Sequence, residues 1–95
     1  MRDPFGLFQE TISVSYAHVL LEIVYEYGID AHVVLHGTGL ILTDMKQADA
    51  KMSAHQWSKL VVNALRLTRN PRLGIEYGFR LRPTSHGALG FAFLS

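Results

Sequence analysis

The sequence contains no cysteine. This absence excludes a disulfide framework, a thiolate metal site and a cysteine nucleophile. The sequence also lacks a run of the ~18–20 apolar residues that a membrane-spanning helix needs, because Glu22 and Glu26 interrupt its most apolar stretch. The first residues do not have the pattern of a signal peptide, in which a charged region precedes a long apolar one. We therefore expect a cytoplasmic protein without a membrane segment.

The first half of the chain has few basic residues, and the second half has few acidic residues. Residues 1–50 contain two basic and seven acidic residues, for a net charge of −5, whereas residues 51–95 contain seven basic and one acidic residue, for a net charge of +6. Three interpretations fit this asymmetry: a basic half that faces a polyanion, two halves that attract each other, or two separately solvated faces.

A length of 95 residues, with 48% hydrophobic and 18% charged residues, is typical of one small globular domain. Hydrophobic periodicity predicts an all-α fold, a small irregular bundle of four to five helices. We expect helices near residues 13–27, 30–36, 53–67, 71–81 and 85–95. Residues 33–42 also fit two short strands around a glycine-rich turn, and propensity alone leaves that alternative open.

Local signals support several of these boundaries. Ser53 and Gln56 have the spacing of a capping box, and Asn70 followed by Pro71 fits the start of the next helix. Gly28 suits the left-handed position after the first long helix. We place Trp57 in the core, between the first long helix and the helix near residues 71–81. In that later helix, Gly74 and Gly78 are four residues apart, which predicts that another backbone passes close by.

Polar residues at helical spacing are the first candidates for chemistry. His18, Glu22 and Glu26 recur every fourth residue on an otherwise apolar helix, so they form a solvated strip, contribute to a ligand pocket or act as an acid–base pair. His32 and His36 have the spacing of two metal ligands on a helix, but a third ligand is missing, and surface histidines beside a turn are the better interpretation.

Other patterns are less specific. Gly37-Thr38-Gly39 lacks the rest of a dinucleotide or phosphate-binding motif, so it indicates a turn. No serine lies in a nucleophile-elbow pattern, and we expect no enzyme activity, no cofactor and no metal. The best candidates for contact with a polyanion are five arginines, and a proline turn and apolar residues interrupt their run: Arg66, Arg69, Arg72, Arg80 and Arg82.

The second half of the chain resembles a known family. A leucine-rich helix leads to Thr-Arg-Asn-Pro at residues 68–71, then Leu-Gly-x-x-x-Gly at 73–78, Arg-Pro at 82–83 and His-Gly-x-x-Gly-Phe at 86–91. In this order the motifs resemble the amino-terminal, arabinose-binding-like domain of AraC/XylS-type bacterial transcription regulators, in the branch that includes regulators of ornithine and other amino-acid utilisation. The resemblance is specific over residues 53–95 and loose over residues 1–52.

The resemblance implies that residues 1–95 are the amino-terminal part of a regulator's sensory domain, for effector sensing and oligomerisation, without the helix-turn-helix region. It implies a small-molecule effector for the complete protein, contact with DNA only through the missing carboxy-terminal domain, and mostly helical structure over residues 30–42 and 79–95. It assigns no effector-binding residue, so the alternative of a stand-alone helical binding module stays open.

The end of the chain predicts self-association. Leu89, Phe91, Phe93 and Leu94 give residues 85–95 an apolar face without a termination signal. Exposed apolar area of this kind is a protein-contact site or an aggregation liability. We expect a homodimer or a higher oligomer.

Overall fold

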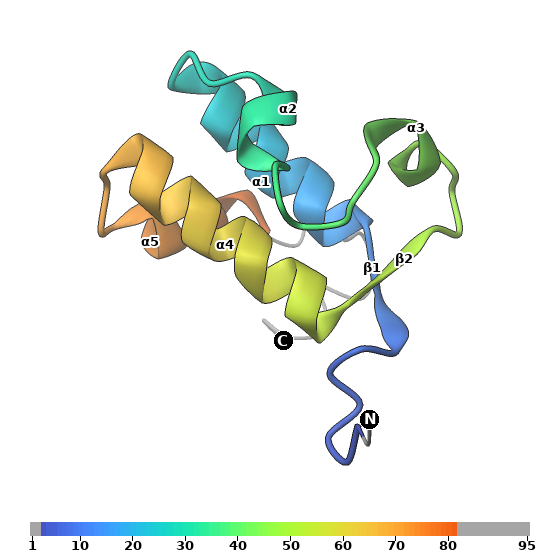
Figure 1. The fold of residues 1–95 in the computed structure, drawn as a ribbon. Coiled ribbons are helices and arrows are strands. Elements are labelled where there is room, and N and C mark those ends of the chain that lie inside the picture. The colour runs from blue at the N-terminus through green and yellow to red at the C-terminus, as the bar shows by residue number, and fades with distance from the viewer. Residues whose placement is uncertain (1–2, 82–95) are drawn as a thin grey trace, which may run out of the picture.

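The computed structural model describes residues 3–81 (Figure 1). In chain order its elements are β1 (Glu10–Ser13), α1 (Ser15–Glu26), α2 (Ala31–Val34), α3 (Leu42–Met45), β2 (Lys51–Ser53), α4 (Ala54–Thr68) and α5 (Leu73–Arg80). The helices surround α1, which contacts α2, α4, α5 and β1. Within residues 3–81, no helix is long and apolar enough to cross a membrane.

The prediction of an all-α fold is wrong, because β1 and β2 form an antiparallel two-stranded sheet. Ile12 pairs with Met52, and the backbone N–H of Val14 donates to the carbonyl of Ala50 at 3.1 Å just beyond the strands. Strands of four and three residues are too short for an alternating pattern to emerge from the sequence. Their pairing depends instead on segments about 40 residues apart in the chain.

The helices at residues 13–27 and 53–67 are confirmed as α1 and α4. Ser53 and Gln56 form the expected capping box: each accepts the other's backbone N–H at 3.0 Å. Gly28 has the expected positive φ, +80°, directly after the C-cap of α1.

One apolar core joins these elements. Burial in the core removes apolar side chains from water, at roughly 25 cal/mol for each Å². Its buried members are Val14, Ala17, Leu20, Ile23, Val24, Val34, Leu35, Met45, Met52, Leu60, Ala64 and Leu73.

The helix near residues 30–36 is confirmed in a shorter form, α2. The Asp30 side chain accepts the backbone N–H of His32 at 2.8 Å and caps its start. The alternative of two strands over residues 33–42 is wrong, and mostly helical structure over residues 30–42 is confirmed only in part. Between α2 and α3 the chain turns at Gly37 and Gly39, which have φ near +80°.

The predicted helix at 71–81 is present as α5, two residues later at its start. Asn70 does not act as its N-cap residue, but its side chain accepts the backbone N–H of Arg72 at 3.0 Å. The expected close backbone contact is wrong for the described part of the chain, because a Cβ added at Gly74 or Gly78 would meet no atom within 4 Å. The helix predicted over residues 85–95 lies outside the described residues.

Candidate functional site

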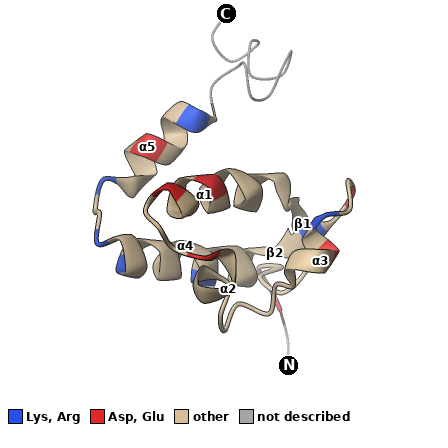
Figure 2. Ribbon diagram, turned by 90° about the horizontal axis from the view of Figure 1, so that it is seen from above, with Lys and Arg blue, Asp and Glu red and all other residues tan. Residues whose placement is uncertain are grey.

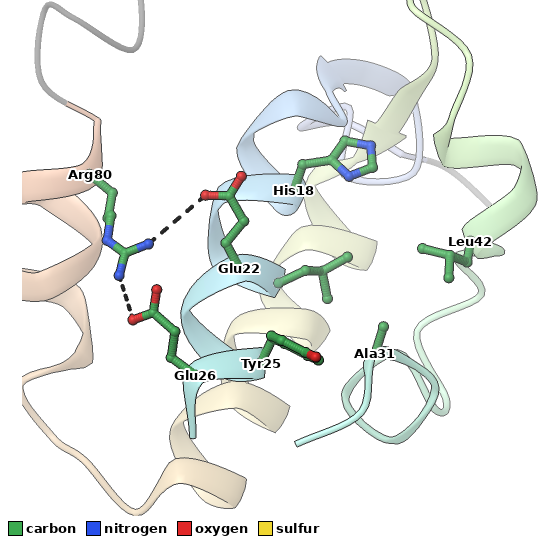
Figure 3. Close-up of a pocket in the computed structure, with 8 residues that line it drawn as sticks. His18, Glu22, Tyr25, Glu26, Ala31, Leu42 and Arg80 are labelled. Carbon is green, nitrogen blue, oxygen red and sulfur yellow. Dashed lines mark hydrogen bonds and ion pairs between the residues drawn. The ribbon is translucent and has the colours of Figure 1, made fainter. Parts of the chain in front are cut away.

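A cavity of about 520 Å³ lies against the polar face of α1 (Figure 3). Four helices contribute to its wall, so side chains distant in sequence meet there. The residues that line it are His18, Leu21, Glu22, Tyr25, Glu26, Ala31, Leu42 and Arg80.

The acidic side of the cavity is held by a side chain from α5. Arg80 Nη2 donates to Glu26 Oε1 at 2.5 Å, and Arg80 Nη1 lies 3.9 Å from Glu22 Oε2. The second distance is too long for a hydrogen bond and leaves a looser ion pair. The hydrogen bond that Arg80 donates to Glu26 raises the pKa of Arg80 above its ordinary value. An arginine guanidinium is charged at neutral pH in any case.

The other side of the cavity is formed by α1, α2 and α3. His18 Nε2 lies 2.7 Å from the carbonyl oxygen of Met45, and a carbonyl can only accept, so Nε2 carries the proton. This bond connects α1 to the end of α3. The apolar groups of Ala31 and Leu42 complete this side, and Leu21 also lines the cavity. The cavity therefore combines two carboxylates and one guanidinium with an apolar wall.

The prediction that His18, Glu22 and Glu26 share one face is confirmed, and the two carboxylates are both solvent-exposed and part of the cavity wall. His32 and His36 are exposed, and His36 lies beyond the end of α2. Within residues 3–81, no group of three or more His, Cys, Asp or Glu side chains could hold a metal ion.

Within residues 3–81, the arginines lie on several elements and do not form one surface. Figure 2 shows the basic positions spread along α4, the connection to α5 and the end of α5. Arg80 is paired with the glutamates of α1, which matches the interpretation that the two oppositely charged halves attract each other. Arg82 lies outside the described residues.

A second, apolar cavity of about 250 Å³ lies between α4 and α5. Trp57 lines it together with Leu20 of α1 and Tyr77 of α5, and its ring centroid lies 5.8 Å from that of Tyr77. The predicted place of Trp57 between the first long helix and α5 is confirmed, although its side chain is only partly buried against the core. The Tyr77 hydroxyl donates to the carbonyl of Tyr16 at 2.9 Å and fixes α5 on α1. Burial raises the pKa of Tyr77 to about 12, with a smaller contribution from Tyr16.

Sequence reasoning missed the residues that reach the first cavity from other helices. Tyr25 is one position from Glu26 on α1, but Ala31, Leu42 and Arg80 meet α1 only through the tertiary fold. The one available signal for Arg80 was the opposite charge of the two halves of the chain.

Comparison with known proteins then identifies the family. Residues 28–95 match the family model described as the N-terminal arabinose-binding domain of AraC transcription regulators. The chain belongs to this family. It is therefore a transcription-regulator domain of the AraC type, as the motifs in its second half indicated.

A curated relative of this AraC-type chain is the "Ornithine utilization regulator" of Pseudomonas aeruginosa. The two are 30% identical over 95 residues, which is all of this chain and 28% of the relative. The chain thus spans less than a third of the length of the regulator that it matches. No solved structure matches it significantly.

Proposed function

We propose that this chain is the effector-sensing and oligomerisation region of an AraC-type transcription regulator. The observation that carries the sensing role is the cavity between α1, α2, α3 and α5. Ligand sites are concave and combine apolar walls with a few convergent polar groups. A ligand in this cavity would contact four helices at once, so its binding energy could change how those helices pack.

The comparison supports an amino acid as the first class of effector to test. The matched relative is named for ornithine utilization, and ornithine carries two ammonium groups and one carboxylate. The cavity presents the opposite set of charges, two carboxylates and one guanidinium. The role we propose is non-catalytic binding in the cytoplasm.

A thermal-shift screen of the 95-residue chain against amino acids, polyamines and sugars tests the sensing role. At least one class should raise the melting temperature, because a ligand that binds only the folded state stabilises it. Ala31→Trp, which fills the cavity wall, should abolish that shift. Ala48→Trp is the matched control, since Ala48 is exposed and does not line the cavity. A screen in which no compound depends on Ala31 contradicts the sensing role.

The apolar cavity between α4 and α5 supports the oligomerisation role. Leu65, which lines it, is exposed by 38%, and Ile75, which follows Gly74 of its lining on α5, is exposed by 61%. A second copy of the chain is the partner we propose, because the −5 and +6 halves of two chains can align in an antiparallel pair. Sedimentation equilibrium at micromolar concentration should give a species heavier than the 10.7 kDa monomer, and a single monomeric species would contradict this role.

We further propose that operator DNA is bound outside the described part of the chain. Sequence-specific proteins place a helix or strand with several base-contacting side chains in one groove. The described arginines lie on several elements, and Arg80 is held by Glu22 and Glu26. Labelled duplex DNA of random sequence should therefore bind the chain no more tightly than other moderately basic proteins do.

A further inference from the structure

We infer that Glu22 and Glu26 form a binding site for a primary ammonium group, and that the ligand displaces Arg80 from these carboxylates. This inference rests on the proposed sensing function and adds the ligand chemistry and its consequence for α5. Arg80 acts as an internal stand-in for the ligand, because its guanidinium already places a nitrogen cation on both carboxylates from a different helix (Figure 3).

The charges favour a cationic ligand. Two glutamates and one arginine leave the acidic side of the cavity with one net negative charge. Of the two glutamates, Glu22 is held more loosely by Arg80. Its Oε2 lies 3.9 Å from Arg80 Nη1, beyond hydrogen-bond distance. An ammonium group has three donors and can bond both carboxylates at a separation of one helical turn.

The rest of the wall suits an aliphatic chain on that ammonium. Ala31 and Leu42 provide apolar groups on the side of the cavity away from Arg80, and Leu21 adds a third apolar group to the wall. The transfer of methylene groups from water to such a surface is favourable. The ligand class that fits both sides is an aliphatic amine, either a basic amino acid or a diamine.

Displacement of Arg80 would loosen α5. The side chains of Arg80 and Tyr77 both connect α5 to α1: Arg80 through the two glutamates, Tyr77 through the carbonyl of Tyr16. The Glu22 and Glu26 side chains are 68% and 55% exposed, and that of Arg80 is 34% exposed, so a ligand can reach the ion pairs from solvent. Exposed ion pairs contribute little to stability, which makes the exchange energetically accessible.

Calorimetric titration of the 95-residue chain with three compounds tests the ligand class. L-Ornithine and putrescine carry a terminal ammonium, whereas 1,4-butanediol has the carbon skeleton of putrescine with a neutral hydroxyl in place of each ammonium. We expect the first two to bind and 1,4-butanediol to bind at least about tenfold more weakly, since the charge-assisted hydrogen bonds to the carboxylates are lost. Equal binding of 1,4-butanediol would overturn the inference. Binding of ornithine without putrescine would show that the carboxylate, and not the ammonium alone, is required, and would overturn it as stated.

Three variants test the exchange. Glu22→Gln should weaken ornithine binding about tenfold, and Glu10→Gln, an exposed carboxylate outside the cavity, should not change it. Arg80→Gln should strengthen binding about two- to fivefold, because the competing cation is removed. Weaker binding in Arg80→Gln would mean that Arg80 holds the ligand, and the exchange would be wrong. Circular dichroism of each variant verifies the fold.

The single tryptophan reports the movement of α5. Trp57 on α4 packs against Tyr77 on α5, so loosening of α5 should change its emission when ornithine binds. Binding without a change in emission would contradict the displacement. If a neutral compound binds in a manner that depends on Ala31 while the amines do not bind, the inference fails and the sensing function stands. If no compound binds in that manner, both fail.

Discussion

The side-chain amide of Asn63 is the sharpest test of how the helices are held together. Its Nδ2 donates to the carbonyl oxygens of Val34 and His36, both at 2.9 Å. These carbonyls lie at and beyond the end of α2, where a helix has no backbone donors of its own to offer. Asn63, on α4, therefore supplies from outside the cap that α2 needs.

The loss of stability when Asn63 is replaced follows from these two hydrogen bonds. At ~0.5–1.5 kcal/mol for each hydrogen bond, Asn63→Ala should lower the free energy of unfolding by about 1–3 kcal/mol. Asn63→Asp should cost about 1 kcal/mol more, because a carboxylate has no N–H and would turn acceptors toward two carbonyl oxygens. A domain of this size loses roughly 4–8 °C in Tm for each kcal/mol.

Urea unfolding followed by far-ultraviolet circular dichroism measures both variants. Lys59→Ala is the control, because Lys59 is exposed on the same helix and should change stability by no more than about 0.5 kcal/mol. An Asn63→Asp chain as stable as the original, or more stable than Asn63→Ala, would refute the assignment of Asn63 as the donor to these carbonyls.

Three further predictions concern Tyr77, Ser53 and Trp57. Burial raises the pKa of Tyr77 from 10.0 to about 12, so between these values the unfolded chain loses this proton first and stability falls as pH rises. Because part of the ring is exposed, we expect the free energy of unfolding to fall by about 1 kcal/mol over this pH range. Urea titrations at several pH values should show that Tyr77→Phe abolishes this fall. Ser53→Ala should cost about 1 kcal/mol in the same unfolding assay, because the capping box with Gln56 is lost. Trp57→Ala should cost about 2–4 kcal/mol in thermal unfolding, less than a fully buried Trp, and an unchanged melting curve would contradict its packing on Tyr77.

Local signals explain which elements the sequence predicts well. The capping box at Ser53, the positive φ at Gly28 and the cap at Asp30 each act within a few residues of the boundary that they define. The same holds for the polar face of α1, because helical geometry alone brings His18 and Glu22 together.

Elements that depend on distant partners could not be predicted in this way. The strands β1 and β2 exist because Ile12 meets Met52 across the sheet, and neither segment has a distinctive pattern by itself. The place of Arg80 beside Glu22 and Glu26 is set by the packing of α5 on α1 through the Tyr77 hydroxyl. Opposite charges in the sequence indicate that such a pair is favourable, but they do not select one arginine among five.

The position of α1 has a consequence for where this domain can be cut. The family match begins at residue 28, two residues after α1 ends, yet α1 contributes Ala17, Leu20, Ile23 and Val24 to the buried core. A chain shortened to the matched segment would leave the inner sides of α2 and α4 open to water, and such a surface promotes aggregation. The boundary of sequence similarity and the boundary of the folding unit therefore differ, so domain exchange between such regulators should carry residues 10–27 along with the matched part.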